Sequence, residues 1–231
     1  MGQHKVSIIV PARAGSKGLK DKNLIKLNGE SLISIAIRQG HLISNNVYVT
    51  TDIERKKIDT DYHYHYFKRQ KELCMDSTNM IDVVIDVIEN NKLHEHEIVL
   101  MQPTTPLRNK DVIKKFLKTE IQSDEILLTV CETEFNTLKS GVIENGKLKA
   151  LNSNEDFFSN RQKLKKTYKT NGALYKFHAL SILKAKSFNL SKLIPIVMNT
   201  EYSIDIDTIE DIDKCRRMFE RYNEDFSSDW H

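Results

Sequence analysis

A loop near the amino terminus combines glycines, a hydroxyl and several cations immediately after an apolar run at residues 6–10. Its residues include Arg13, Gly15, Ser16, Lys17, Gly18, Lys20 and Lys22. Glycine lets backbone N–H groups approach phosphate oxygens closely, and lysine and arginine neutralise the phosphate charge. The loop therefore predicts a polyanionic ligand, and a nucleoside triphosphate fits this chemistry. A basic surface loop with no ligand is the alternative.

Two widespread phosphate-binding patterns do not describe this loop. The run Gly15-Ser16-Lys17 lacks the glycine four residues earlier that a Walker A loop requires. The loop also lacks the G-x-G-x-x-G pattern of dinucleotide sites. The ligand therefore has to be identified with the help of other segments.

A second segment with binding chemistry lies near the carboxyl terminus. Asp205 and Asp207 are two residues apart in a stretch that is expected to be extended, so both carboxylates point to the same side. Hard oxygen ligands of this kind suit magnesium, Mg²⁺ (or Mn²⁺). Asp207 has an alternative structural role, because Asp207-Thr208-Ile209-Glu210 has the pattern of a helix capping box.

The loop Gln102–Arg108 follows another apolar run. Two prolines stiffen it, and its side-chain amide and hydroxyls can bind a neutral, hydroxylated ligand. A rigid turn between a strand and a helix is the alternative interpretation.

The elements that must position these residues alternate between short β-rich runs and amphipathic runs of helical length. This alternation predicts a doubly wound α/β fold with a mostly parallel sheet, in which ligands bind beyond the carboxyl ends of the strands. Strands are expected at 6–10, 47–51, 62–67 (at an edge), 98–101, 126–130, 171–177 and 194–198. Helices are expected after Ser31, over 81–88, from Asn109 to about Thr119, and from Thr208 to about Phe226.

The segment from about 132 to 168 interrupts the alternation. Residues 142–148 predict a hairpin around the turn Asn145-Gly146, and a polar, irregular stretch follows. We interpret residues 1–231 as a single domain that carries an insertion at about 132–168.

The composition narrows the class of protein. With 35 Lys and Arg against 32 Asp and Glu in 231 residues, the formal net charge is +3, which is too balanced for a general nucleic-acid binder. Cys74, Cys131 and Cys215 lack the spacing of a zinc site or a disulfide framework, which fits a reducing compartment. No apolar run approaches the roughly 18 residues that span a bilayer, so we expect a soluble, cytoplasmic protein with no membrane partner.

Four segments together resemble the signature of the N-acylneuraminate (sialic acid) cytidylyltransferases, the CMP-nonulosonate synthetase family. They are 10–23, Leu100–Arg108, Asn171–Tyr175 and Ser203–Thr208, and they occur in the family's order and at its usual separations. The resemblance covers nearly the whole chain. It implies a nucleotide-diphospho-sugar transferase-like (Rossmann-like) fold. It also implies a homodimer in which the insertion crosses to the second subunit and helps close the sugar site.

The resemblance further implies roles for individual residues. The catalytic residues would be Arg13, Lys17 and Asp207, and the metal would be held by Asp205 and Asp207. CTP would be contacted by Ala12, Ser16, Lys22, Asn23 and Arg69. The sugar acid would be contacted by Gln102, Arg161 and Tyr175. The planar fork of donors on Arg161 suits the carboxylate of the sugar. Asp52 is either a further polar contact or a helix N-cap.

The implied reaction joins CTP and a nonulosonic acid to give a CMP-sugar and pyrophosphate. Met80 stands where the family commonly offers a small hydroxyl residue to the ligand. This leaves N-acetylneuraminic, legionaminic and pseudaminic acids open as substrates. Transfer to another keto-sugar, such as a Kdo-like acid, is an alternative, and so is a non-catalytic protein that binds a nucleotide sugar.

Overall fold

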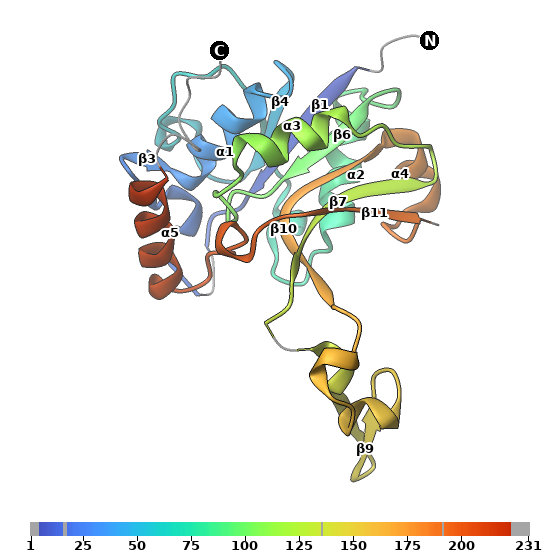
Figure 1. Ribbon diagram of the computed structural model, residues 1–231. Helices are drawn as coiled ribbons and strands as arrows, with labels where there is room; N and C mark the ends of the chain where they lie inside the picture. The colour runs from blue at the N-terminus through green and yellow to red at the C-terminus, as the bar shows by residue number, and fades with distance from the viewer. Residues whose placement is uncertain (1–4, 16–17, 135, 191, 223–231) are drawn as a thin grey trace.

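A seven-stranded sheet forms the centre of the computed structural model, which describes residues 5–15, 18–134, 136–190 and 192–222. The strand order is β11-β7-β10-β6-β1-β4-β5. Neighbouring strands are parallel except for β10, which is antiparallel to both β6 and β7. The predicted mostly parallel sheet is confirmed (Figure 1). The strands are β1 (Val6–Ala12), β4 (Val47–Thr51), β5 (His65–Lys68), β6 (Glu97–Met101), β7 (Glu125–Glu132), β10 (Tyr168–His178) and β11 (Lys192–Val197).

Helices cover both faces of this sheet. Ile8 and Val10 of β1 pack in one core with α1 and α3, whereas Ile9 packs in a second core with α2 and α4. Successive side chains point to opposite faces of a strand, and a parallel sheet that is covered on both faces buries all of them. The doubly wound arrangement is thereby confirmed. The helices are α1 (Leu32–His41), α2 (Met80–Asn90), α3 (Lys110–Lys118) and α4 (Ala179–Ala185).

Two predicted helix starts are confirmed by their caps. The Ser31 hydroxyl accepts the Ser34 N–H at 3.2 Å at the start of α1. The Asn109 side chain accepts the Val112 N–H at 3.0 Å at the start of α3. Both bonds satisfy a backbone donor that a helix leaves without an internal partner.

The start of the last helix, α5 (Ile209–Arg221), corrects one prediction. The capping box is present but lies one residue later than expected. The Thr208 hydroxyl accepts the Asp211 N–H at 3.3 Å, and the Asp211 carboxylate accepts the Thr208 N–H at 3.1 Å. Thr208 is extended and is the true N-cap, so the carboxylate of Asp207 does not cap the helix.

Within the described residues, no helix has the length and apolar character that crossing a membrane requires.

Other differences from the predicted elements are modest. β5 begins at His65 rather than at residue 62, although it does lie at the sheet edge. β10 begins at Tyr168, before the predicted start, and has an irregular register between Thr170 and Tyr175. The short strands β2 (Lys26–Leu27) and β3 (Glu30–Ser31) and helix α4 were not predicted.

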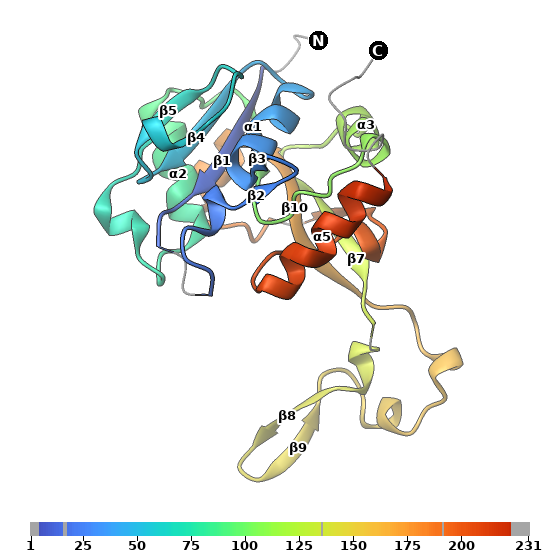
Figure 2. The same ribbon diagram turned by 90° about the vertical axis from the view of Figure 1, so that its left-hand side faces the viewer.

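The segment between β7 and β10 leaves the sheet and projects from the body of the protein (Figures 1 and 2). It contains the hairpin β8 (Gly141–Glu144) and β9 (Lys147–Ala150). Asn145 and Gly146 have φ angles of 49° and 73°, the left-handed values that a tight Asn-Gly hairpin needs. The predicted hairpin is confirmed.

Candidate functional site

The carboxyl ends of β1, β4, β5 and β6 meet at one edge of the sheet. Ala12, the last residue of β1, is fully buried and lies opposite Thr51 in β4. Asp52 follows β4, and its Oδ1 accepts the Ala14 N–H at 2.6 Å. The next 3₁₀ turn has Glu54 as its N-cap residue, so Asp52 acts as a polar contact and not as that cap. This contact fixes the first turn of the amino-terminal loop.

Within this loop, Arg13 contacts an acidic side chain from another loop. Its Nη2 lies 2.5 Å from Oδ1 of Asp76, and its Nη1 donates to the Gly15 carbonyl at 3.1 Å. Gly15 has a φ of +68°, which glycine adopts without strain. Asn23 donates from Nδ2 to the Arg13 carbonyl at 2.9 Å. Arg13 and Asn23 therefore lie together in this loop.

The amino-terminal loop also contacts the acidic segment near the other end of the chain. Lys22 Nζ lies 2.7 Å from Oδ1 of Asp207. Gly18 lies so close to the Asp207 carbonyl that a Cβ added there would come within 2.8 Å of its oxygen. The Lys22 side chain is only 13% exposed, whereas that of Asp207 is 71% exposed. The cationic loop and the acidic pair thus form one site that remains open to solvent.

The geometry of the acidic pair agrees with its i, i+2 spacing. Asp205 and Asp207 are exposed and flank Ile206, which is fully buried. The Ile206 N–H donates to the Thr104 carbonyl at 2.8 Å, which ties this segment to the loop after β6. In the described part of the chain, no cluster of three or more His, Cys, Asp or Glu side chains is arranged to hold a metal ion. The two carboxylates suit Mg²⁺, which usually takes one or two carboxylates together with substrate phosphate oxygens.

The loop after β6 meets the irregular part of β10. Gly172 has a φ of +74°, and a Cβ added there would lie 3.6 Å from Gln102 Oε1. The Thr105 hydroxyl donates to the Asn171 carbonyl at 3.1 Å. Tyr175 is half-buried, and its burial raises the pKa of its hydroxyl. The negative charge of nearby Asp205 raises this pKa further. Gln102 and Tyr175 therefore lie in the same region as the acidic segment.

One predicted CTP contact, Arg69, is buried inside the protein. Arg69 is buried and donates to the carbonyl and hydroxyl of Thr50 at 2.8 and 3.3 Å, so it supports the end of β4. Its burial lowers the pKa of its guanidinium. Its contact with CTP stays a prediction. The predicted CTP contact Ser16 and the predicted catalytic residue Lys17 lie outside the described residues.

Arg161 lies in the projecting segment, in a short 3₁₀ turn. Figures 1 and 2 show that this segment extends away from the edge of the sheet where the other predicted residues meet. A single chain therefore does not bring Arg161 together with Gln102 and Tyr175.

Sequence reasoning missed the role of one buried amide. Asn171 accepts a hydrogen bond from the Thr129 hydroxyl at 2.7 Å and donates to the Ser203 hydroxyl at 2.9 Å. It thereby links β7, β10 and the start of the acidic segment. A glycine directly after an asparagine inside the strand β10 is the signal that could have indicated this role.

Met80 lies at the first turn of α2. It lines a surface pocket of about 460 Å³ together with residues that follow α4. The other lining residues are Asn79, Ile81, Lys186, Ser187, Phe188 and Asn189.

Comparison with known proteins identifies the family. A family model described as cytidylyltransferase matches residues 7–227. The chain belongs to the cytidylyltransferase family. The chain is 30% identical over 214 residues to the N-acylneuraminate cytidylyltransferase of Streptococcus agalactiae serotype V, and the matched region covers 88% of this chain and 50% of that protein. It is 27% identical over 221 residues to the pseudaminic acid cytidylyltransferase of Campylobacter jejuni serotype O:2. The matched region covers 91% of this chain and 94% of that protein.

The chain thus spans about half the length of its Streptococcus relative. Among solved structures, it is similar to CMP:2-keto-3-deoxy-manno-octonic acid synthetase complexed with CTP, with a TM-score of 0.62 and 16% identity over 94% of this chain and 99% of that one. At this identity the likeness concerns the fold. It confirms the predicted nucleotide-diphospho-sugar transferase-like fold of the chain.

Proposed function

We propose that this cytidylyltransferase activates a nonulosonic acid with CTP. The anomeric hydroxyl of the sugar acid attacks the α-phosphorus, the bond from this phosphorus to the bridging oxygen of the β-phosphate breaks, and pyrophosphate leaves. The observation that carries the proposal is the 2.7 Å contact between Lys22 and Asp207, since it unites the cationic loop with the acidic pair. The similarity to N-acylneuraminate and pseudaminic acid cytidylyltransferases supports the class of sugar.

The chain's own residues supply mainly charge and orientation. Arg13, Lys17 and Lys22 neutralise the phosphates and hold them in line for attack. When CTP binds, Arg13 releases Asp76 and contacts phosphate oxygens instead. Lys22 likewise releases Asp207 and contacts phosphate oxygens. The remaining CTP contacts in this proposal are Ala12, Ser16, Asn23 and Arg69.

Asp205 and Asp207 fit a magnesium ion, because their exposed carboxylates are hard oxygen donors beside the phosphate-binding loop. When bound, the ion would neutralise charge on the phosphates. Asp207 also orients the anomeric hydroxyl for attack and accepts its proton. Gln102 and Tyr175 hold the sugar acid.

We further propose that the protein is a homodimer in which Arg161 of one chain binds the sugar carboxylate in the site of the other. Support comes from the projecting segment, which is too small to bury its own apolar side chains. Phe158 is 90% exposed and Ile143 is 78% exposed. Burial of these side chains against a second copy is favourable by roughly 25 cal/mol for each Å² of apolar surface removed from water. Other exposed apolar residues of this region are Val142, Leu148, Leu151 and Tyr168.

Replacement of Phe158 by glutamate tests this dimer. A charge at the interface opposes association, so Phe158→Glu is expected to shift the protein from dimer to monomer in sedimentation, and to raise the KM for the sugar acid. Leu180→Glu is the matched control, because Leu180 is also an exposed apolar residue but lies on the main body. A parent protein that sediments as a monomer at all concentrations would contradict the dimer.

The proposed reaction is tested with a panel of substrates. The parent protein, CTP and Mg²⁺ are incubated with N-acetylneuraminic, legionaminic, pseudaminic or Kdo acid, and products are identified by mass. We expect a CMP adduct and equimolar pyrophosphate with at least one of the first three acids. Product with Kdo alone would favour the alternative keto-sugar reaction. Binding of a CMP-sugar in calorimetry, with no product from any acid or nucleotide, would favour a non-catalytic binding protein.

A further inference from the structure

A cation lies buried behind the loop that carries Gln102. Arg108, between β6 and α3, is 1% exposed. Its Nη1 donates to the carbonyls of Gln102 at 2.8 Å and Thr105 at 2.5 Å, and its Nε donates to Gln39 Oε1 at 2.8 Å. The Ala173 carbonyl lies 3.4 Å from the same Nη1. Among the described residues, no carboxylate forms an ion pair with Arg108.

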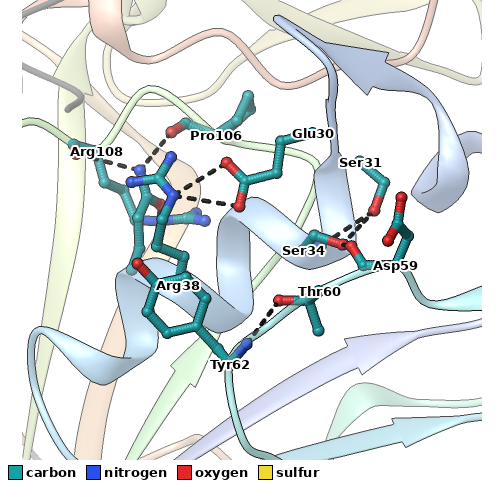
Figure 3. Close-up of polar contacts among 10 residues, drawn as sticks. Glu30, Ser31, Ser34, Arg38, Asp59, Thr60, Tyr62, Pro106 and Arg108 are labelled. Carbon is teal, nitrogen blue, oxygen red and sulfur yellow. Dashed lines mark hydrogen bonds and ion pairs between the residues drawn. The ribbon is translucent and has the colours of Figure 1, made fainter. Parts of the chain in front are cut away.

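A buried guanidinium without a carboxylate needs a reason, because burial of a charge is strongly unfavourable unless dipoles compensate for it. Burial, with a smaller effect from Arg38, lowers the pKa of Arg108 to about 9, so the side chain remains protonated at neutral pH. Arg38 itself is bound by both carboxylate oxygens of Glu30 at 3.0 and 3.2 Å, beside the loop that carries Pro106 and Arg108 (Figure 3). The charge of Arg108 is thus kept. Its Nη1 donates to loop carbonyls and its Nε donates to Gln39, whereas its buried Nη2 has no hydrogen-bond partner among the described residues.

Gln39 of α1 completes this arrangement. While its Oε1 accepts from Arg108, its Nε2 donates to the Pro106 carbonyl at 2.9 Å. Gln39 is 2% exposed and sits on a helix, so it provides a rigid support. The backbone of residues 102–106 is therefore held at three carbonyls by two buried side chains.

The loop held in this way contacts both β10 and the acidic segment. Its first residue is Gln102, which lies next to Gly172 of β10. Its Thr104 carbonyl accepts the N–H of Ile206, the residue between the two exposed aspartates. A change in the backbone of the loop would therefore displace Gln102 and the acidic pair together.

We propose that Arg108 and Gln39 form a buried clamp that sets the backbone of residues 102–106 and thereby positions both Gln102 and the acidic pair Asp205 and Asp207. The kinetic consequences of this inference, on the KM for the sugar acid and on the Mg²⁺ dependence, rest on the proposed function. Both side chains act through the loop, so they are positioning residues.

The test compares Arg108→Lys with the parent protein. Lysine keeps the charge but cannot bond several carbonyls in the fixed geometry of a guanidinium. We expect the KM for the sugar acid and the Mg²⁺ concentration for half-maximal activity both to rise about 10–100-fold, the usual effect of losing a residue that orients a ligand-binding group. The Kd for CTP without metal should change less than either of these constants, because the amino-terminal loop is also fixed by Asp52 and Asp76, which the clamp does not contact. Gln39→Leu is the second variant and is expected to act in the same direction.

Lys176→Met is the matched control. Lys176 is also a buried cation that donates to a backbone carbonyl, that of Thr119, but it lies further along β10, away from Asn171. Its loss should lower stability while leaving both kinetic constants unchanged. Hydrogen exchange provides a readout that does not depend on activity: amides in residues 100–107 and 203–208 should exchange faster in Arg108→Lys than in the parent.

The outcomes separate the two proposals. A parent protein that makes no CMP-sugar overturns the proposed function, whereas the exchange experiment still decides the role of Arg108. A folded Arg108→Lys protein with parental exchange in both segments overturns the clamp. The clamp is also overturned if Lys176→Met changes the same kinetic constants by the same factors.

Discussion

Replacement of Lys22 by methionine is expected to lower kcat/KM for CTP by roughly 10²–10³-fold, the usual effect of removing one donor that stabilises developing charge. Methionine retains the apolar stem, which is mostly buried, but removes the ammonium that lies 2.7 Å from Asp207. The fold should survive, because the lost ion pair has one highly exposed partner and such pairs contribute little to stability. Pyrophosphate release under steady-state conditions measures the effect.

Lys26→Met is the control for this experiment. Lys26 is four residues away, and its exposed ammonium lies 3.4 Å from Asp59, outside the proposed site. Its replacement should leave turnover unchanged. Parental turnover in a folded Lys22→Met protein would show that Lys22 does not act on the phosphates.

Replacement of Asp205 or Asp207 by asparagine is expected to weaken the dependence on metal. Asparagine keeps the size of the side chain and removes its charge. Two unit charges 4 Å apart attract by about 1 kcal/mol in water and about 4 kcal/mol near a protein surface, and the double charge of Mg²⁺ doubles these values. Because about 1.4 kcal/mol corresponds to tenfold, the Mg²⁺ concentration for half-maximal activity should rise by at least about tenfold. Asp207→Asn should also lower kcat, since Asp207 acts on the attacking hydroxyl in the proposed reaction.

Metal titrations of activity with Mg²⁺ and with Mn²⁺ measure this change. Asp213→Asn provides the control, because Asp213 is an exposed aspartate of α5 that pairs with Arg216 away from the loop. Unchanged metal titrations in both Asp205→Asn and Asp207→Asn would refute the proposed metal site, even if the reaction itself is shown.

Much of the fold could be predicted because its determinants are local. The caps Ser31 and Asn109 each bond to an N–H three residues later, so the relevant atoms are close in the chain itself. Strands such as β4 are short apolar runs whose ends matched the prediction. The Asn145-Gly146 turn likewise depends only on which residues tolerate positive φ angles.

The differences arise where distant segments decide between local alternatives. Two overlapping capping boxes are possible at the start of α5, and Ile206 selects the later one. Its side chain is buried in the cluster that contains Leu107 and Phe219, and its N–H bonds to Thr104. Asp207 is thereby held outside the helix. The direction of β10 was also not predictable, because a buried strand has the same apolar pattern when it runs parallel or antiparallel.

By itself, the sequence determined which chemical groups are available: the cationic loop, the acidic pair and the amide of Gln102, each after a recognisable run of residues. Only the tertiary structure decided that Lys22 meets Asp207 across 185 positions, and that the charge of Arg108 is buried against loop carbonyls. The physical reason is that ion pairs and hydrogen bonds depend on separations of about 3 Å between atoms, and packing sets such separations for residues far apart in the chain.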